Sequence, residues 1–172
     1  MATADGDIEH LLATKTATPI AQLGPELPDQ ETRKVNGEVT ITWPFSSVSK
    51  SVAFLLAEPD FRLRRDKGQV RVQLNGPSAE AVGALELGSG DEVTLDLEGV
   101  EWARDEEPAR PPGSRSDWQL KFVGRLTLKV GRFGSAQRVF FLQYITGHTW
   151  RISRNKLHQH RPARPYRARR GI

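Results

Sequence analysis

The segment that most restricts the fold of this chain is 69–74, in which apolar and polar residues alternate without a break. Three apolar side chains fall on one side of an extended chain, while Arg71 and Gln73 fall on the other. Strict alternation is typical of a β-strand with one buried face. The fold must therefore give this strand a core on one side and leave a polar, cationic face toward solvent.

Comparable patterns elsewhere predict four more strands and one helix. The five predicted strands are 35–43, 51–57, 69–74, 92–97 and 118–130. Pro44 ends the first strand, the fourth resumes at 100–103, and Gly124 interrupts the fifth. Between the third and fourth strands, Ser78 is a suitable N-cap for a short helix over 79–85.

Three strands, a helix and two further strands are the order of an all-β oligonucleotide/oligosaccharide-binding (OB) fold. This fold is a five-stranded Greek-key barrel, here with one short helix between strands three and four. A half-open sandwich is the main alternative. We expect residues 19–131 to form the OB-fold domain.

The two ends of the chain differ from this domain in composition. Residues 1–18 are polar, with one short helical turn around Ile8, and we expect them to be disordered. Residues 132–172 are basic, and we expect a disordered extension in which 139–145 forms either a strand or a helix. A frame-shifted gene model is the other explanation for the change of character after residue 131.

The positive charge of the chain is concentrated near its C-terminus. The net charge is +4, but residues 151–172 hold seven Arg and one Lys without any acid. The first 150 residues therefore carry a net charge of −4. Binding of a polyanion by the predicted domain must depend on a local basic patch rather than on total charge.

Composition also argues against several other classes of protein. The chain has no cysteine, which excludes disulfides, thiolate zinc sites and a cysteine nucleophile. No apolar run approaches the roughly 18 residues of a membrane helix, and the acidic N-terminus does not resemble a signal peptide. The four histidines lie in the predicted tails, and there is no phosphate-binding glycine loop with its lysine. We expect no enzyme activity, no metal, no cofactor, no small-molecule substrate and no membrane partner.

Several segments resemble one known family. They are TPIAQLGPELPD at 18–29, GEVTITWP at 37–44, AFLLAEPDFRLRR at 53–65, GDEV at 90–93 and LEGVEW at 97–102. Over residues 18–130 the chain is similar to the N-terminal OB domain of fungal telomere-end proteins, the single-stranded DNA-binding family typified by the protection-of-telomeres protein. The resemblance implies binding of single-stranded telomeric DNA, a role in telomere maintenance, and a location at chromosome ends in the nucleus. The last forty residues lie outside the resemblance.

An OB barrel binds its ligand on the outer face of strands two and three and between two of its loops. Stacking aromatics and cations are the side chains that bind single strands, and amide or guanidinium groups can read base edges. The candidates are Phe45 and Lys50 in the first loop; Phe61, Arg62, Arg64, Arg65 and Lys67 in the second; Arg71 and Gln73 on the third strand; and Trp102, Arg104, Arg110, Arg115 and Trp118 at the last loop.

The aromatic residues are expected to have different roles. Trp43 shares a face with Val39, so we expect it in the core together with Phe54. Phe61, in a cationic loop, is the best stacking candidate. Trp102 and Trp118 either stack on bases or clamp the ends of the acidic loop between them.

Two other functions remain open at this point. In the first, the domain is an OB-fold module that docks other subunits of a telomere or other nucleoprotein complex and does not bind DNA. In the second, the basic tail alone binds nucleic acid, without sequence preference. Steep salt dependence is expected of the latter.

Overall fold

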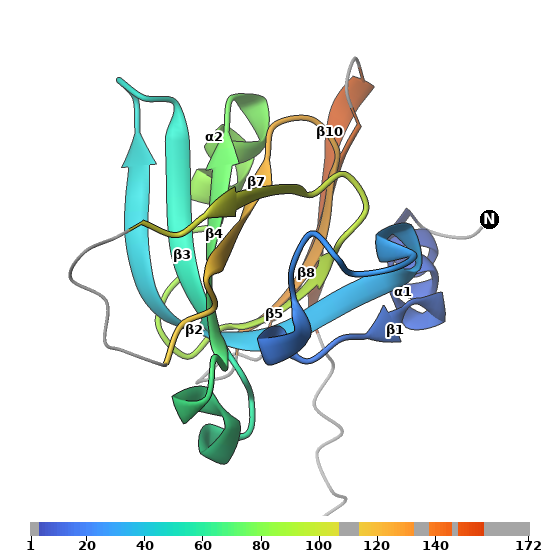
Figure 1. Cartoon of the computed structure of the whole chain (residues 1–172). Coiled ribbons are helices and arrows are strands. Elements are labelled where there is room, and N and C mark those ends of the chain that lie inside the picture. Colours follow the sequence, from blue (N-terminus) through green and yellow to red (C-terminus); the bar gives the residue numbers. More distant parts are fainter. Residues whose placement is uncertain (1–3, 107–113, 133–137, 146–147, 157–172) are drawn as a thin grey trace, which may run out of the picture.

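The computed structural model describes residues 4–106, 114–132, 138–145 and 148–156, and the fold is mostly β (Figure 1). The described strands are β1 (Thr16–Ala17), β2 (Arg33–Ser46), β3 (Ser51–Ala57), β4 (Gln69–Asn75), β5 (Glu92–Asp96), β6 (Glu101–Arg104), β7 (Trp118–Phe122), β8 (Leu126–Arg132), β9 (Arg138–Ile145) and β10 (His148–Lys156). The helices are α1 (Ala4–Thr14), α2 (Pro77–Ala84) and the 3-10 helices η1 (Ile20–Gln22), η2 (Gln30–Thr32) and η3 (Phe61–Arg65). None of the described helices is long and apolar enough to cross a membrane.

Within the described residues, nine strands follow one another in the order β10-β9-β8-β5-β2-β3-β4-β7-β6, and β1 adds to β2. The two end strands, β10 and β6, are not paired with each other. β4 and β7 run parallel, whereas the other pairs along this path are antiparallel. The segment that forms β5 and β6 pairs with the segment that forms β7 and β8, first strand with last. The sheet curves strongly around its core (Figure 1).

The predicted strands are present, with two adjustments. The fourth and fifth are each divided in two, as β5 with β6 and β7 with β8, which confirms the expected interruptions. Pro44 does not end the first strand, because β2 continues to Ser46. Beyond Glu38, β2 pairs with β3 but no longer with β5. Proline is tolerated there because one edge of the strand is free within the described sheet.

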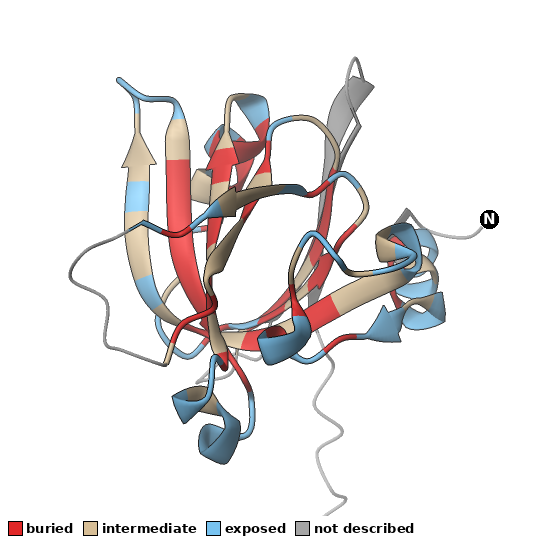
Figure 2. Ribbon diagram, in the orientation of Figure 1, coloured by how far each residue is buried: buried red, intermediate tan, exposed pale blue. Residues whose placement is uncertain are grey.

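The core lies inside the curve of the sheet, and β4 shows how the strands face it (Figure 2). Val70, Val72 and Leu74 are fully buried, while Arg71 and Gln73 are only half-buried. The alternation predicted from sequence is therefore confirmed. Phe54 on the neighbouring strand is 1% exposed, as expected of a core residue.

The direction of Trp43 differs from the prediction. Val39 is buried, but the register of β2 against β3 shifts between Val39 and Ile41. A bulge of this kind inserts one residue and reverses which side chains face inward. Trp43 is consequently half-buried outside the core cluster, and Ile41 is 47% exposed. The prediction of a core Trp43 was wrong because the alternation does not continue through the bulge.

The start of α2 also differs from the prediction. Gly76 occupies the N-cap position with a φ of 68°, and Pro77 is the first helical residue. Proline suits this position because its φ is already helical and its missing N–H is not needed there. Ser78 is not the cap; it is buried, and its hydroxyl donates to the Asn75 carbonyl.

Ordered elements extend beyond the predicted domain of 19–131 at both ends. Ile8 and Leu12 of α1 are buried against Phe141 of β9, where the sequence suggested disorder. β9 and β10 continue the sheet from β8, so 139–145 is a strand. The prediction of disorder was wrong for these elements, because pairing between distant segments buries apolar residues that look isolated in the sequence. Residues 1–3, 133–137, 146–147 and 157–172 lie outside the described part.

A buried ion pair joins the N-terminal segment to the sheet. Lys15 Nζ lies 2.9 Å from Asp96 Oδ1 and 3.1 Å from Glu98 Oε2. Burial raises the pKa of Asp96 above its ordinary value, while hydrogen bonds from Lys15 and from the Glu98 backbone act in the opposite direction.

Candidate nucleic-acid interface

On the side of the sheet that faces away from the core, one row of paired residues runs from Trp43 to polar residues of β4, β7 and β6. Trp43 pairs with Ala53, Ala53 with Gln73, Gln73 with Lys121, and Lys121 with Glu101. Directly paired residues on neighbouring strands point to the same side. We call the surface of this side across β2, β4 and β7 the outer face; it comprises Ile41, Trp43, Arg71, Gln73, Gln119 and Lys121.

A cation stacked on an aromatic ring lies at the centre of the outer face. The guanidinium carbon of Arg71 is 4.4 Å from the centroid of the Trp43 ring. Gln73, two residues along β4, donates through Nε2 to Asn75 Oδ1 at 3.3 Å. The pair thus presents a flat group and a positive charge at one place on a half-buried surface.

An open pocket of about 500 Å³ continues the outer face toward β6 and β7. It is lined by Arg71, Gln73, Ala103, Arg104, Asp105, Glu106, Gln119 and Lys121. Gln119 donates through Nε2 to the Arg104 carbonyl at 3.0 Å, which fixes the orientation of its amide. The pocket offers three cationic side chains and two amides, with Glu106 as an exposed acid at its margin.

The loop between β3 and β4 contains η3, the dark green coil at the bottom of Figure 1. Asp60 caps it, because its carboxylate accepts from the Arg62 N–H at 2.9 Å. Phe61 is 66% exposed, and Leu63 is 52% exposed. Arg62 and Arg65 are exposed as well, so this loop combines an accessible ring with accessible cations.

Three other predicted cations are held by acids. Arg64 Nη2 lies 2.8 Å from Glu38 Oε2. Arg115 is buried with Asp105 at 3.4 Å, so its assignment as a residue of the DNA surface was wrong. Lys67 contacts Asp117 at 3.0 Å, and both side chains remain largely exposed.

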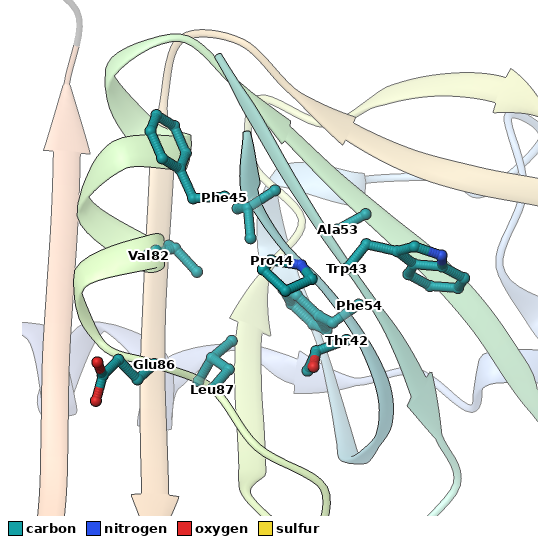
Figure 3. A pocket seen from close by; sticks show the side chains of 11 residues that line it. Thr42, Trp43, Pro44, Phe45, Ala53, Phe54, Val82, Glu86 and Leu87 are labelled. Carbon is teal, nitrogen blue, oxygen red and sulfur yellow. The ribbon is translucent and has the colours of Figure 1, made fainter. Parts of the chain in front are cut away.

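The candidates of the first loop lie apart from the outer face. Phe45 packs against the core. It also lies close to α2, since a Cβ added to Gly83 would be 2.8 Å from the Cβ of Phe45. Figure 3 shows Phe45 directed toward α2, while the Trp43 ring points the other way. Phe45 is therefore a packing residue, and its prediction as a base-contacting residue was wrong. Lys50 is exposed in the turn between β2 and β3.

The two tryptophans near the last loop both make contacts within the protein. Trp102 packs against the core, and its indole N–H donates to Gln30 Oε1 at 3.0 Å. The guanidinium of Arg104 lies 4.3 Å from the Trp118 ring, in a cross-strand pair of β6 and β7. These contacts favour the structural one of the two predicted roles. Arg110, in the same loop, lies outside the described residues.

Four residues of the outer face were not predicted as site residues. Ile41 and Trp43 were missed because of the bulge in β2. Gln119 and Lys121 alternate with the buried Leu120, so the pattern of 118–122 already contained the signal that they face outward. In the described part of the chain, no group of three or more His, Cys, Asp or Glu side chains is arranged to hold a metal ion.

Comparison with known proteins adds one finding. A family model described as Domain of unknown function (DUF8502) matches residues 13–138. Neither the curated proteins nor the solved structures gave a match.

Proposed function

We propose a function for this chain, which belongs to the DUF8502 family: it binds single-stranded DNA on its outer face, without catalysis or cofactor. The resemblance of residues 18–130 to telomere-end proteins makes telomeric single-stranded DNA the expected ligand. In that case the protein contributes to the protection and maintenance of chromosome ends in the nucleus.

The strand connections support an OB-type interpretation of the fold. β2, β3 and β4 form an antiparallel meander, α2 follows, β5 returns to pair with β2, and β7 pairs parallel with β4. We interpret β5 with β6 as the fourth OB strand and β7 with β8 as the fifth. In this interpretation, the connection between β7 and β8 lies where an OB barrel closes, although the end strands of the described sheet, β10 and β6, do not pair with each other.

The observation that carries the proposal is the Arg71–Trp43 stack on an open face, with an exposed Phe61 in the adjoining loop. Single-strand-binding proteins combine aromatic rings, on which bases stack, with cations that follow the phosphates. Base stacking contributes about 1–3 kcal/mol per base. Two rings and a few phosphate contacts can therefore bind a single strand, even in a domain whose net charge is negative.

Residues of the outer face and of η3 have distinct chemical roles in this proposal. Trp43 and Phe61 stack on bases, and Arg71 and Lys121 neutralise phosphates. The amide of Gln73 has a donor and an acceptor on the surface where the DNA would bind, which suits recognition of base edges. Arg62 and Arg65 extend the phosphate contacts along η3.

Fluorescence anisotropy of the full chain with a labelled single strand of G-rich telomeric repeats tests the proposal. The W43A/F61A double variant should bind at least about thirtyfold more weakly, since two stacking contacts are removed. The matched control is V123A, an exposed apolar residue between β7 and β8. Equal affinities of the double variant and the parent would show that the outer face is not the site.

The second candidate is an OB-fold interaction module that docks a protein partner. The observation that favours it is an apolar pocket of about 390 Å³ between β2 and α2, lined in part by Pro44, Phe45, Val82 and Leu87 (Figure 3). The same titration separates the two functions, because a docking module gives no anisotropy change with any single strand. Duplex DNA and a mixed-sequence strand complete the series.

A further inference from the structure

We infer that Glu38 and Arg64 form a latch that positions η3, so that Phe61 is held at the edge of the outer face. Arg64 is then a positioning residue rather than a phosphate ligand. This inference rests on the proposed function, which it extends from the sheet to the loop.

The guanidinium of Arg64 is already engaged within the protein through two of its nitrogens. Its Nε donates to the Glu58 carbonyl at 2.7 Å, and its Nη2 donates to Glu38 Oε2 at 2.8 Å. Its carbon lies 5.7 Å from the centroid of the Phe61 ring. The Arg64 side chain is only 17% exposed. A phosphate would have to displace a charge-assisted hydrogen bond to reach this group.

Glu38 brings the loop to the correct side of the sheet. It pairs with Ala57 on β3, and Ala57 pairs with Gln69 on β4. Gln69 shares its side of β4 with Arg71, because the two are separated by one residue. Glu38 therefore lies in the same surface as the outer face, and the latch ties η3 to that surface.

The root of the loop is fixed by separate contacts. The Glu58 N–H donates to the Gly68 carbonyl at 2.8 Å, and Glu58 Oε1 accepts from the Ile20 N–H at 2.6 Å. A Cβ at Gly68 would lie 2.0 Å from the Leu63 carbonyl oxygen, so the chain approaches itself closely there. With the root held in this way, removal of Glu38 releases the orientation of η3 without opening the loop.

The sign of one mutational effect separates a latch from a phosphate contact. Removing the negative charge of Glu38 should strengthen binding of a polyanion, and it would also free Arg64 to contact a phosphate. If the pair instead positions Phe61, the same change weakens binding because a stacking contact is lost. The two interpretations predict opposite directions.

The experiment measures anisotropy of the full chain with the labelled telomeric single strand at several salt concentrations. We expect E38A to bind about fivefold to tenfold more weakly, as expected for partial loss of one stacked base. E38Q should retain most of the affinity, since its amide oxygen still accepts from Arg64. R64A should weaken binding without lowering the salt slope, whereas loss of a phosphate contact lowers it by about 0.7. The control is E92A, an exposed acid that pairs with Glu38 across β2 and β5.

Binding of E38A equal to or tighter than that of the parent overturns the latch, as does a reduced salt slope for R64A. If the parent itself binds no single strand, the proposed function fails, and limited trypsin digestion then decides the latch. Cleavage after Arg62 and Arg65 should be faster in E38A than in E92A, and equal rates would overturn the inference. Thermal unfolding of each variant verifies that it is folded.

Discussion

The outer face and the neighbouring segment 114–117 bury their arginines to different extents. On the outer face, Arg71 is half-buried and stacks on Trp43 at the edge of an open pocket. Beside the start of β4, Arg115 is buried and pairs with Asp105. Both arginines lie at β4: Arg71 belongs to this strand, and Arg115 forms a β-bridge with Gln69 at its start.

The difference shows that burial, rather than the number of basic residues, decides which cations a ligand can reach. A buried ion pair contributes to the fold, and breaking it leaves an uncompensated charge in the interior. A half-buried cation on an open aromatic surface lies where a bound single strand can reach it. Substitutions in the two regions should therefore affect different measurements.

The largest effect is expected for R115A, which removes one partner of the buried pair. The free energy of unfolding should fall by about 3–5 kcal/mol, because the buried carboxylate of Asp105 loses a cationic partner. Urea unfolding measures this loss, and the affinity of the folded fraction for a telomeric single strand should stay within about twofold. An apolar D105L/R115M pair is the control and should recover much of the stability. Loss of binding with unchanged stability would reverse the comparison.

A smaller effect of the opposite kind is expected for W43A. The free energy of binding to the single strand should become less favourable by about 1–3 kcal/mol, since the aromatic ring on which a base stacks is lost. The free energy of unfolding should change by less than about 1 kcal/mol, because Trp43 lies outside the core cluster. Anisotropy and urea unfolding measure the two quantities, with W43F as the variant that retains a ring. A large loss of stability without loss of affinity would make Trp43 a packing residue.

The next effect concerns Arg71 and is best read from salt dependence. R71A should weaken binding about fivefold to tenfold and reduce the salt slope by about 0.7, the value of one phosphate contact on a single strand. The matched control is K129A on β8, whose lysine contacts Glu9 at 3.0 Å. Equal slopes for R71A and the parent would remove Arg71 from the list of phosphate ligands.

The smallest effect is expected for K67A, which breaks the exposed pair with Asp117. Exposed ion pairs contribute about 0–1 kcal/mol, so the unfolding free energy should change by less than about 0.5 kcal/mol. The affinity for the telomeric single strand should fall by no more than about threefold, since Lys67 lies in the loop before β4 and not on the outer face. Urea unfolding of K67A and D117A side by side checks the first expectation, and a loss comparable to that of R115A would contradict it.

Local patterns in the sequence were sufficient for the five predicted strands and for the exposure of some residues of the candidate site. The alternation around Arg71 and Gln73 fixed both the strand and its polar face, and the exposed Phe61 agrees with the composition of its loop. These features depend on neighbours in the chain, which a sequence pattern reports directly.

Features that depend on distant partners were not predictable in this way. The bulge near Thr40 redirected Trp43, and no residue type marks it in the sequence. Arg115 is buried together with Asp105, a residue from the other end of its loop. The helix α1 packs its buried residues against Phe141. In each case the deciding contact is formed by a segment that the local pattern does not contain.

Two-dimensional NMR of the isotopically labelled full chain, titrated with the telomeric single strand, tests the central claim most directly. The account predicts the largest shift changes at the Trp43 indole and at the amides of Ile41, Arg71, Gln73 and Lys121, with a second group around Phe61. Shift changes confined to β9, β10 or residues 157–172, or no changes at all, would contradict it.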